Sequence, residues 1–228
     1  MVRLKTSHFR LDWKILRSLF SISWVGFVQF FIASASWIVL ARIMTSFRID
    51  AAIAGYGVAI RIIMFFLLPA WGMSNAAATL VGQNLGAGQP ARAEASVRMT
   101  ARYNAIFMAV VTLVFMLFAT SIVRFMNKDP EVEQYAIQAL RVISLGYIFY
   151  GIGMVLINSF NGAGDTKTPT VINLFGFWAF QIPLAYLLAH VLDMGPLGVF
   201  IAIPVAEFVI TLSAFVLFKK GKWKTVKV

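Results

Sequence analysis

The chain of 228 residues has no cysteine and few charged residues. Without cysteine it can form no disulfide, no thiolate metal ligand and no thiol nucleophile. Charged residues make up 13% of the sequence and hydrophobic residues 60%, against about 25% and about 45–50% in an ordinary soluble domain. Because so few polar side chains cannot cover a soluble protein of this size, we expect an integral membrane protein whose main partner is the lipid bilayer.

Residues that carry out chemistry are also scarce. The two histidines, His8 and His190, lie at the flanks of different apolar runs. There is no Ser/His/Asp set, no pair of histidines at metal spacing and no pair of carboxylates on one helical face. Nothing in the sequence supports hydrolysis or metal catalysis, so we predict that the chain is not an enzyme and carries no cofactor.

The basic residues give a net charge of +11, which in a soluble protein would indicate nucleic-acid binding. Their positions argue against that partner. Half of the twenty lie in the first seventeen or the last ten residues, next to apolar runs. Basic residues at such flanks face anionic lipid headgroups, so we expect no nucleic acid as a partner.

Apolar runs long enough to cross a bilayer, about 20 residues each, occur six times. They lie at Ser18 to Ile43, Ile53 to Gly82, Tyr103 to Val123, Ala136 to Phe160, Thr170 to His190 and Pro196 to Phe218. The segments between them hold the Gly, Pro and charged residues that end helices. The pattern predicts an all-α polytopic membrane protein with six transmembrane helices.

We predict three parts: a cytoplasmic amphipathic interfacial segment at residues 1–17, a six-span region at 18–218 and a basic cytoplasmic tail at 219–228. Fourteen Lys and Arg residues fall on one side of the membrane and four on the other. This asymmetry predicts a multi-pass protein of the cell (inner) membrane with both termini cytoplasmic. The first part has an alternative reading, a signal peptide cleaved after Ala33-Ser34-Ala35, but its apolar stretch is long enough to span.

Glu207 is the only carboxylate near the middle of an apolar run. An ionisable group at that depth is costly and is by default a functional candidate, so we expect a cation or proton site there. The alternative is a structural glutamate bonded to backbone near Pro204. Arg61 and Arg141 are nearer the ends of their runs, where long side chains reach the interface.

Uncharged polar residues and prolines interrupt the apolar runs. The polar ones either line a cavity or bond across helices, and the candidates for cavity lining are Gln29, Asn75, Asn158, Asn173 and Gln181. The prolines remove helix hydrogen bonds, and the candidates for kinks are Pro69, Pro183 and Pro204. The small residues Ala51, Gly55 and Ala59, at four-residue spacing, predict a close helix contact.

The stretch LVGQNLGAGQPARAE, Leu80 to Glu94, is the most glycine-rich break. It does not fit a phosphate-binding loop, which needs a Lys and a hydroxyl after its last glycine. It also lacks the preceding strand of a dinucleotide-binding turn. We interpret it as the end of one helix, a cytoplasmic turn and the start of another.

Three stretches together resemble the multidrug and toxic compound extrusion (MATE) family. The run from Tyr56 to Glu94 is similar to the eighth span and following loop of that family, through Pro69-Ala-Trp-Gly72 and Val81-Gly-Gln-Asn-Leu-Gly-Ala-Gly88. Asn158 to Pro169, NSFNGAGDTKTP, resembles the loop after its tenth span, and Gly195 to Pro204 the entry to its twelfth.

The resemblance implies that the six spans form one lobe of a MATE-type antiporter, its C-terminal half. Such a protein exports organic cations or other small drug-like xenobiotics by alternating access, with H⁺ or Na⁺ as coupling ion. The expected partners are then a small-molecule substrate and a missing N-terminal lobe or a second copy. Some members carry cation-binding acids in the first and fourth spans of this lobe; this chain has none there, so those sites do not carry over.

Two other functions stay open from the sequence. The chain could be a non-transporting membrane fragment that acts in assembly or interaction. It could also be a lipid-linked saccharide flippase of the wider superfamily, but such a cavity should be rich in Arg and Lys, and only Arg61 and Arg141 are available for it.

Overall fold

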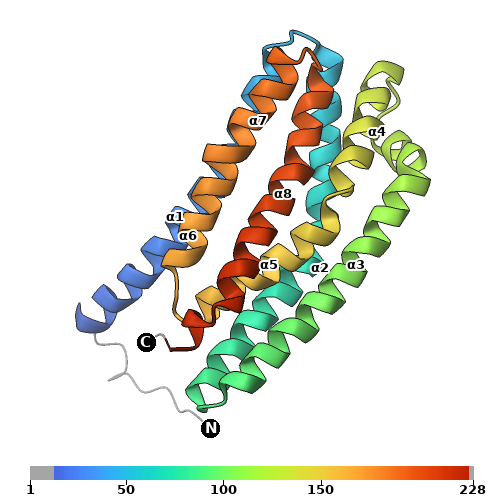
Figure 1. The fold of residues 1–228 in the computed structure, drawn as a ribbon. Helices are drawn as coiled ribbons and strands as arrows, with labels where there is room; N and C mark the ends of the chain where they lie inside the picture. Colours follow the sequence, from blue (N-terminus) through green and yellow to red (C-terminus); the bar gives the residue numbers. More distant parts are fainter. Residues whose placement is uncertain (1–12, 226–228) are drawn as a thin grey trace, which may run out of the picture.

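The computed structural model describes residues 13–225, which form an elongated bundle of helices (Figure 1). Its α-helices are α1 (Trp13–Thr45), α2 (Asp50–Gly86), α3 (Pro90–Met126), α4 (Pro130–Ser144), α5 (Tyr147–Gly162), α6 (Lys167–Asn173), α7 (Ile182–Tyr186) and α8 (Pro196–Lys219). Two π-helical segments, Leu174–Gln181 and Leu187–Val191, join α6 and α7 into one rod, Lys167–Val191. A 3₁₀ turn covers Lys222–Thr225. The described part of the chain contains no strand, as predicted for an all-α protein.

Prolines and a capping aspartate set where several helices begin. Pro90, Pro130 and Pro196 each occupy the first residue of their helix, where the missing N–H has no intrahelical partner in any case. Asp129 caps α4, because its Oδ1 accepts hydrogen bonds from the backbone N–H groups of residues 131 and 132 at 2.9 and 3.4 Å.

The glycine-rich break at Gly86-Ala87-Gly88 ends α2 as the sequence predicts. Gly88 has a φ of 69°. Its N–H donates to the Leu85 carbonyl at 2.9 Å, and the N–H of Gln89 donates to the Asn84 carbonyl at 2.8 Å. This is a Schellman motif. The same motif ends α5, where Gly164 has a φ of 83°. Both glycine-rich breaks therefore end their helices with the same C-terminal capping motif.

Five of the six predicted spans are single long helical rods, and the fourth is not. The run Ala136 to Phe160 was expected as one helix, but it divides into α4 and α5, which meet at an angle of 54°. The break falls at Gly146, where a Cβ would come within 2.6 Å of the Cα of Pro204 in α8. Glycine is a weak helix former. The helix therefore breaks at Gly146, where the absence of a side chain lets α8 approach closely.

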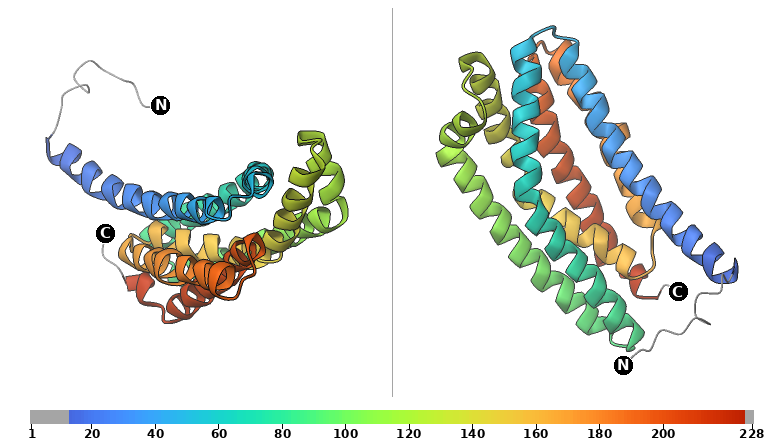
Figure 2. Two further views of the ribbon diagram at one scale, coloured as in Figure 1. Left: turned by 90° about the horizontal axis from the view of Figure 1, so that it is seen from above. Right: turned by 180° about the vertical axis from the view of Figure 1, so that it is seen from behind.

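The spans pack in two groups with α8 between them. α1 lies beside the Lys167–Val191 rod, to which it is joined by a 3.0 Å hydrogen bond from the Trp178 indole N–H to the Ile32 carbonyl (Figure 2). α2, α3, α4 and α5 form the other group, and α8 contacts both α5 and the rod. The predicted small-residue contact is confirmed at Gly55, where a Cβ would lie 2.7 Å from the Cβ of Tyr135 in α4.

A buried asparagine ties the second group together. Asn104 of α3 is fully buried, and its amide donates to the carbonyls of Gly151 at 2.9 Å and Ala70 at 3.4 Å. Three helices therefore share one side chain. Hydrogen bonds of this kind stabilise helix association where the apolar solvent gives no hydrophobic drive.

The outer surface is apolar, as expected for a protein in lipid. Large side chains such as Phe20, Trp24 and Phe65 are more than half exposed. The chain is a multi-pass membrane protein. Within residues 13–225, Trp13 begins a helix that runs unbroken into the first span. Phe9, on which the predicted interfacial helix depends, lies outside the described residues, so that helix stays a prediction.

Candidate functional site

A cavity of about 480 Å³ opens between α1, α2, α5, the Lys167–Val191 rod and α8. We call it the central cavity. Its volume is in the range typical of small-molecule sites. Its polar lining comprises Gln29, Ser34, Asn158, Asn161, Asn173 and Glu207, and its aromatic lining includes Phe30, Trp37, Trp71, Tyr150 and Phe177. Neither Lys nor Arg is among the described residues that line it.

A chain of side-chain amides crosses one wall of the central cavity. Gln29 and Asn161 exchange two hydrogen bonds at 3.1 and 3.2 Å, and Gln29 also donates to the Thr166 carbonyl at 3.1 Å. Asn158 is one turn from Asn161 on α5 and donates to the Ser74 hydroxyl on α2. The amides thus link α1, α2 and α5, and they leave further donors and acceptors for a ligand.

Glu207 lies in α8 and is the only carboxylate among the described residues that line this cavity. The residue is only 5% exposed, and its Oε1 has no hydrogen-bond partner among the described residues. No neighbouring backbone group therefore bonds this oxygen, and the cation or proton site at Glu207 stays a prediction. An ionised carboxylate in such a place would lack the partners that offset its lost hydration.

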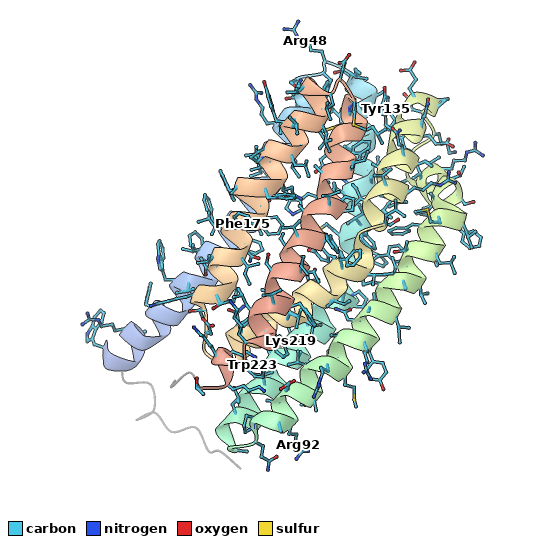
Figure 3. All side chains as sticks on the ribbon, in the orientation of Figure 1. Arg48, Arg92, Tyr135, Phe175, Lys219 and Trp223 are labelled. Carbon is cyan, nitrogen blue, oxygen red and sulfur yellow. The ribbon has the colours of Figure 1, made fainter. Side chains whose placement is uncertain are left out.

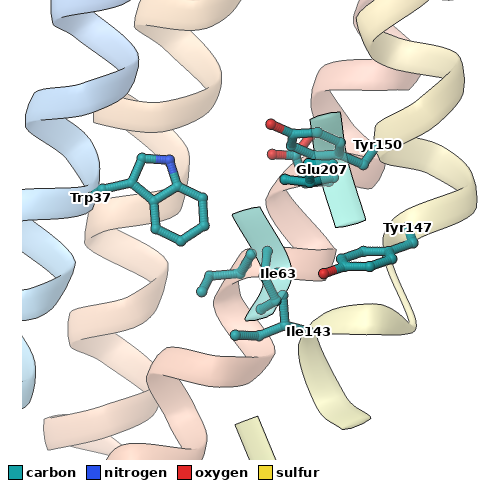
Figure 4. Close-up of a pocket in the computed structure, with 9 residues that line it drawn as sticks. Trp37, Ile63, Ile143, Tyr147, Tyr150 and Glu207 are labelled. Carbon is teal, nitrogen blue, oxygen red and sulfur yellow. The ribbon is translucent and has the colours of Figure 1, made fainter. Parts of the chain in front are cut away.

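Glu207 also lines a second, much smaller space, which shares Trp37 and Tyr150 with the central cavity. This chamber has a volume of about 10 Å³, close to the space needed for one water molecule. Trp37, Ile63, Ile143 and Tyr147 surround it (Figure 4). The Tyr147 hydroxyl is buried and, like Glu207 Oε1, has no hydrogen-bond partner among the described residues.

The predicted site residues divide into those the fold brings together and those it does not. Gln29, Asn158, Asn173 and Glu207 all line the central cavity. Asn75, in contrast, is exposed on another face of α2, and Gln181 is only 1% exposed and outside the cavity lining. The expectation that these last two line the cavity is not met.

The sequence reasoning also missed residues of the site. Asn161 lies one turn after Asn158, a spacing that places both amides on one face of a helix. Tyr147 and Tyr150 share their face of α5 in the same way, but tyrosine at helical spacing in an apolar run gives no signal of its own. Only the packing of α8 against α5 shows that both tyrosines line the same small space as Glu207.

The three prolines lie inside helical segments but in different settings. Pro69 is inside α2, and Pro204 is inside α8 against Gly146. Pro183 is the second residue of α7, one residue after the π-helical segment Leu174–Gln181 ends. Since proline removes an N–H and clashes with a carbonyl one turn back, a wider π-helical turn before Pro183 relieves that clash. Arg61 and Arg141 are both exposed, as expected for side chains that reach the interface.

Up to six spans, the fourth of them broken, and a cavity of mixed polar and aromatic lining define the chain as a polytopic membrane protein with space for a small molecule. The comparisons with known proteins agree. Residues 24–187 match the family model described as MatE, so the chain belongs to the MATE family of multidrug transporters.

The relatives are longer proteins. A probable multidrug resistance protein NorM of Thermotoga maritima is 24% identical over 213 residues, which is 93% of this chain and 46% of the relative. A Shewanella oneidensis protein named FAD transporter is 24% identical over 170 residues, 75% of this chain and 37% of the relative. The chain therefore spans about half the length, or less, of these curated relatives.

A solved structure shares the fold. The transporter of the MOP superfamily from Pyrococcus furiosus superposes with a TM-score of 0.89 at 20% sequence identity, over 99% of this chain and 51% of that one. The described helices thus have the arrangement of one half of such a transporter.

Proposed function

We propose that the chain is the C-terminal half of a proton-coupled efflux transporter for small aromatic molecules that are cationic or neutral. One observation carries this proposal: Glu207 is the only carboxylate among the described residues of the central cavity, it also lines the water-sized chamber, and its Oε1 has no hydrogen-bond partner among those residues. Ligand selectivity and ion coupling would then share one side chain.

The lining of the central cavity supports the choice of substrate. Trp37, Trp71, Tyr150 and Phe177 offer ring faces, which attract organic cations as well as aromatic molecules. Glu207 adds the only negative charge when ionised. A ligand with phosphate groups, such as the flavin dinucleotide in the name of the Shewanella relative, would need Arg or Lys partners, and the described lining has none.

The same geometry supports a proton as the coupling ion. The described residues contain no group of three or more His, Asp or Glu side chains that could hold a metal ion. Hard cations are usually held by several oxygen ligands, whereas Glu207 is the single carboxylate among the described residues that line the chamber. A proton satisfies the buried carboxylate without further ligands.

In the proposed cycle, protonated Glu207 is stable while the site is closed, because the neutral form avoids a buried unpaired charge. A cationic substrate in the central cavity favours the ionised form, so that substrate and proton exclude each other. Binding of the substrate or of the proton then shifts the equilibrium between the inward-open and outward-open arrangements of the two lobes. The broken fourth span, at Gly146 beside Pro204, is the proposed point of movement on this lobe.

The test compares this chain alone with a full-length version that carries an N-terminal six-span half. Efflux of a fluorescent organic cation from vesicles is followed under an imposed proton gradient or an imposed sodium gradient. We expect efflux from the full-length version with the proton gradient and none from the chain alone. Efflux from the chain alone at the full-length level would contradict the half-transporter proposal, and a response to sodium alone would contradict the proton.

A further inference from the structure

A second cavity, separate from the central one, lies among α3, α5, α8 and the 3₁₀ turn Lys222–Thr225. It has a volume of about 270 Å³. Its charged lining is Glu94, Arg98, Arg102, Lys219 and Lys224, and its apolar lining is Val97, Ala101, Ile152, Leu156, Phe215 and Phe218. We call it the basic pocket. Lys219 and Trp223 lie toward the same end of the bundle as Arg92, with Arg48 at the opposite end (Figure 3).

The pocket is built by ordered structure and not by a loose tail. Trp223 is 1% exposed, stacks on Phe218 with ring centroids 4.8 Å apart, and donates its indole N–H to the Phe218 carbonyl at 3.0 Å. Gly221, with a φ of 72°, makes the turn between α8 and this anchor. The anchor holds the next residue, Lys224, over the pocket.

A single carboxylate is present among the four basic groups. Glu94 accepts a hydrogen bond from Lys224 and lies 3.6 Å from Arg98. Both of its contacts orient basic side chains toward the pocket. One negative charge cannot neutralise four positive ones, so the pocket keeps a surplus of positive charge that calls for an anion.

The floor of the pocket is apolar and suits a hydrocarbon group. Leu156 and Phe218 are buried at its base, while Phe215 is 48% exposed on the outer face of α8. Phe215 lies one turn before Lys219 and so continues the pocket from the charged end toward the apolar part of the helix. The site therefore offers cations at the membrane surface and an apolar path below them.

We propose that the basic pocket binds one anionic phospholipid. Its phosphate would lie among Arg98, Arg102 and Lys219, and an acyl chain would lie along Phe215 and Ile152. Basic pockets between spans at the membrane surface are suited to lipid headgroups of this kind, and Arg pairs with phosphate through two parallel hydrogen bonds. The mixed lining distinguishes this ligand from a soluble anion, which would make no use of the apolar floor.

The test uses the complete chain, purified in detergent and incubated with phosphatidylglycerol, with phosphatidylcholine, or with inorganic phosphate. Bound lipid is counted by native mass spectrometry, and thermal unfolding is measured in parallel. We expect phosphatidylglycerol to be retained at least about tenfold better than phosphatidylcholine, a difference of about 1.4 kcal/mol. The midpoint of unfolding should rise with phosphatidylglycerol only.

Matched variants keep the proposal falsifiable. Arg98→Gln with Arg102→Gln should abolish the preference. Arg92→Gln with Lys220→Gln removes the same charge from the same end of the bundle outside the pocket lining, and should leave the preference unchanged. Lys219→Gln, at the exposed end of α8, gives a milder test if the first pair does not fold. Equal retention of both lipids, equal loss in both double variants, or the full rise in midpoint with phosphate alone would each overturn the proposal.

Discussion

Gly146 and Pro204 touch across the joint of the broken fourth span: a Cβ built on Gly146 would come within 2.6 Å of both the Cα and the Cβ of Pro204. The contact brings the bend between α4 and α5 against the helix that carries Glu207. It also explains why glycine is needed at residue 146, because a Cβ there would overlap both proline atoms and push α8 away.

The first prediction concerns this contact. Gly146→Ala should destabilise the chain by about 1–3 kcal/mol, because extra volume in a packed interior forces backbone shifts. Gly72→Ala is the matched control, since a Cβ there meets nothing within 4 Å in the middle of α2. That variant should be neutral or slightly more stable. Thermal unfolding in detergent measures both, and equal midpoints for the two variants would refute the packing role of Gly146.

The buried amide of Asn104 gives a second prediction. Asn104→Ala removes its bonds to the carbonyls of Gly151 and Ala70 and should cost about 0.6–2 kcal/mol, the range for polar bonds between membrane helices. Asn75→Ala changes the same residue type at an exposed position on α2 and should have little effect. A drop in unfolding midpoint as large for Asn75→Ala as for Asn104→Ala would contradict this account.

A third prediction uses the absence of cysteine from this chain; any cysteine of an added N-terminal half is replaced to give a thiol-free background. In a full-length version, Asn158→Cys should react with a water-soluble thiol reagent and should be protected by an organic cation, because residue 158 lines the central cavity. Gln181→Cys should react at least about tenfold more slowly, since buried thiols are inert and residue 181 is 1% exposed. Equal labelling of both, or no protection by substrate, would show that the cavity does not admit substrate.

Helix boundaries were predictable because they depend on local residue chemistry. Gly88 and Pro90 mark the α2–α3 turn in the sequence, and the Schellman motif appears there as expected. The break at Gly146 was not predictable. It depends on contact with Pro204 from a helix far along the chain, while Leu145 and Gly146 themselves lie in an unbroken apolar run.

The site was predictable in part for the same reason. Glu207 is recognisable in the sequence because a carboxylate in the middle of an apolar span is costly on any face of the helix. Asn75 and Asn158 look alike in sequence, but one is exposed and the other lines the cavity. In lipid both faces of a helix are apolar, so hydrophobic periodicity does not tell the outside from the inside.

The central claim is that Glu207 couples substrate movement to a proton, and Glu207→Gln in the full-length version tests it most directly. Glutamine has the shape of the protonated acid but cannot release a proton, so folding should be kept while proton-driven efflux of a fluorescent cation falls at least about tenfold. Glu133→Gln is the control, because that carboxylate pairs with Arg124 at 2.8 Å and does not line the central cavity; it should transport normally. The account predicts loss of proton-driven efflux for Glu207→Gln alone, and efflux at the level of the unaltered protein would contradict it.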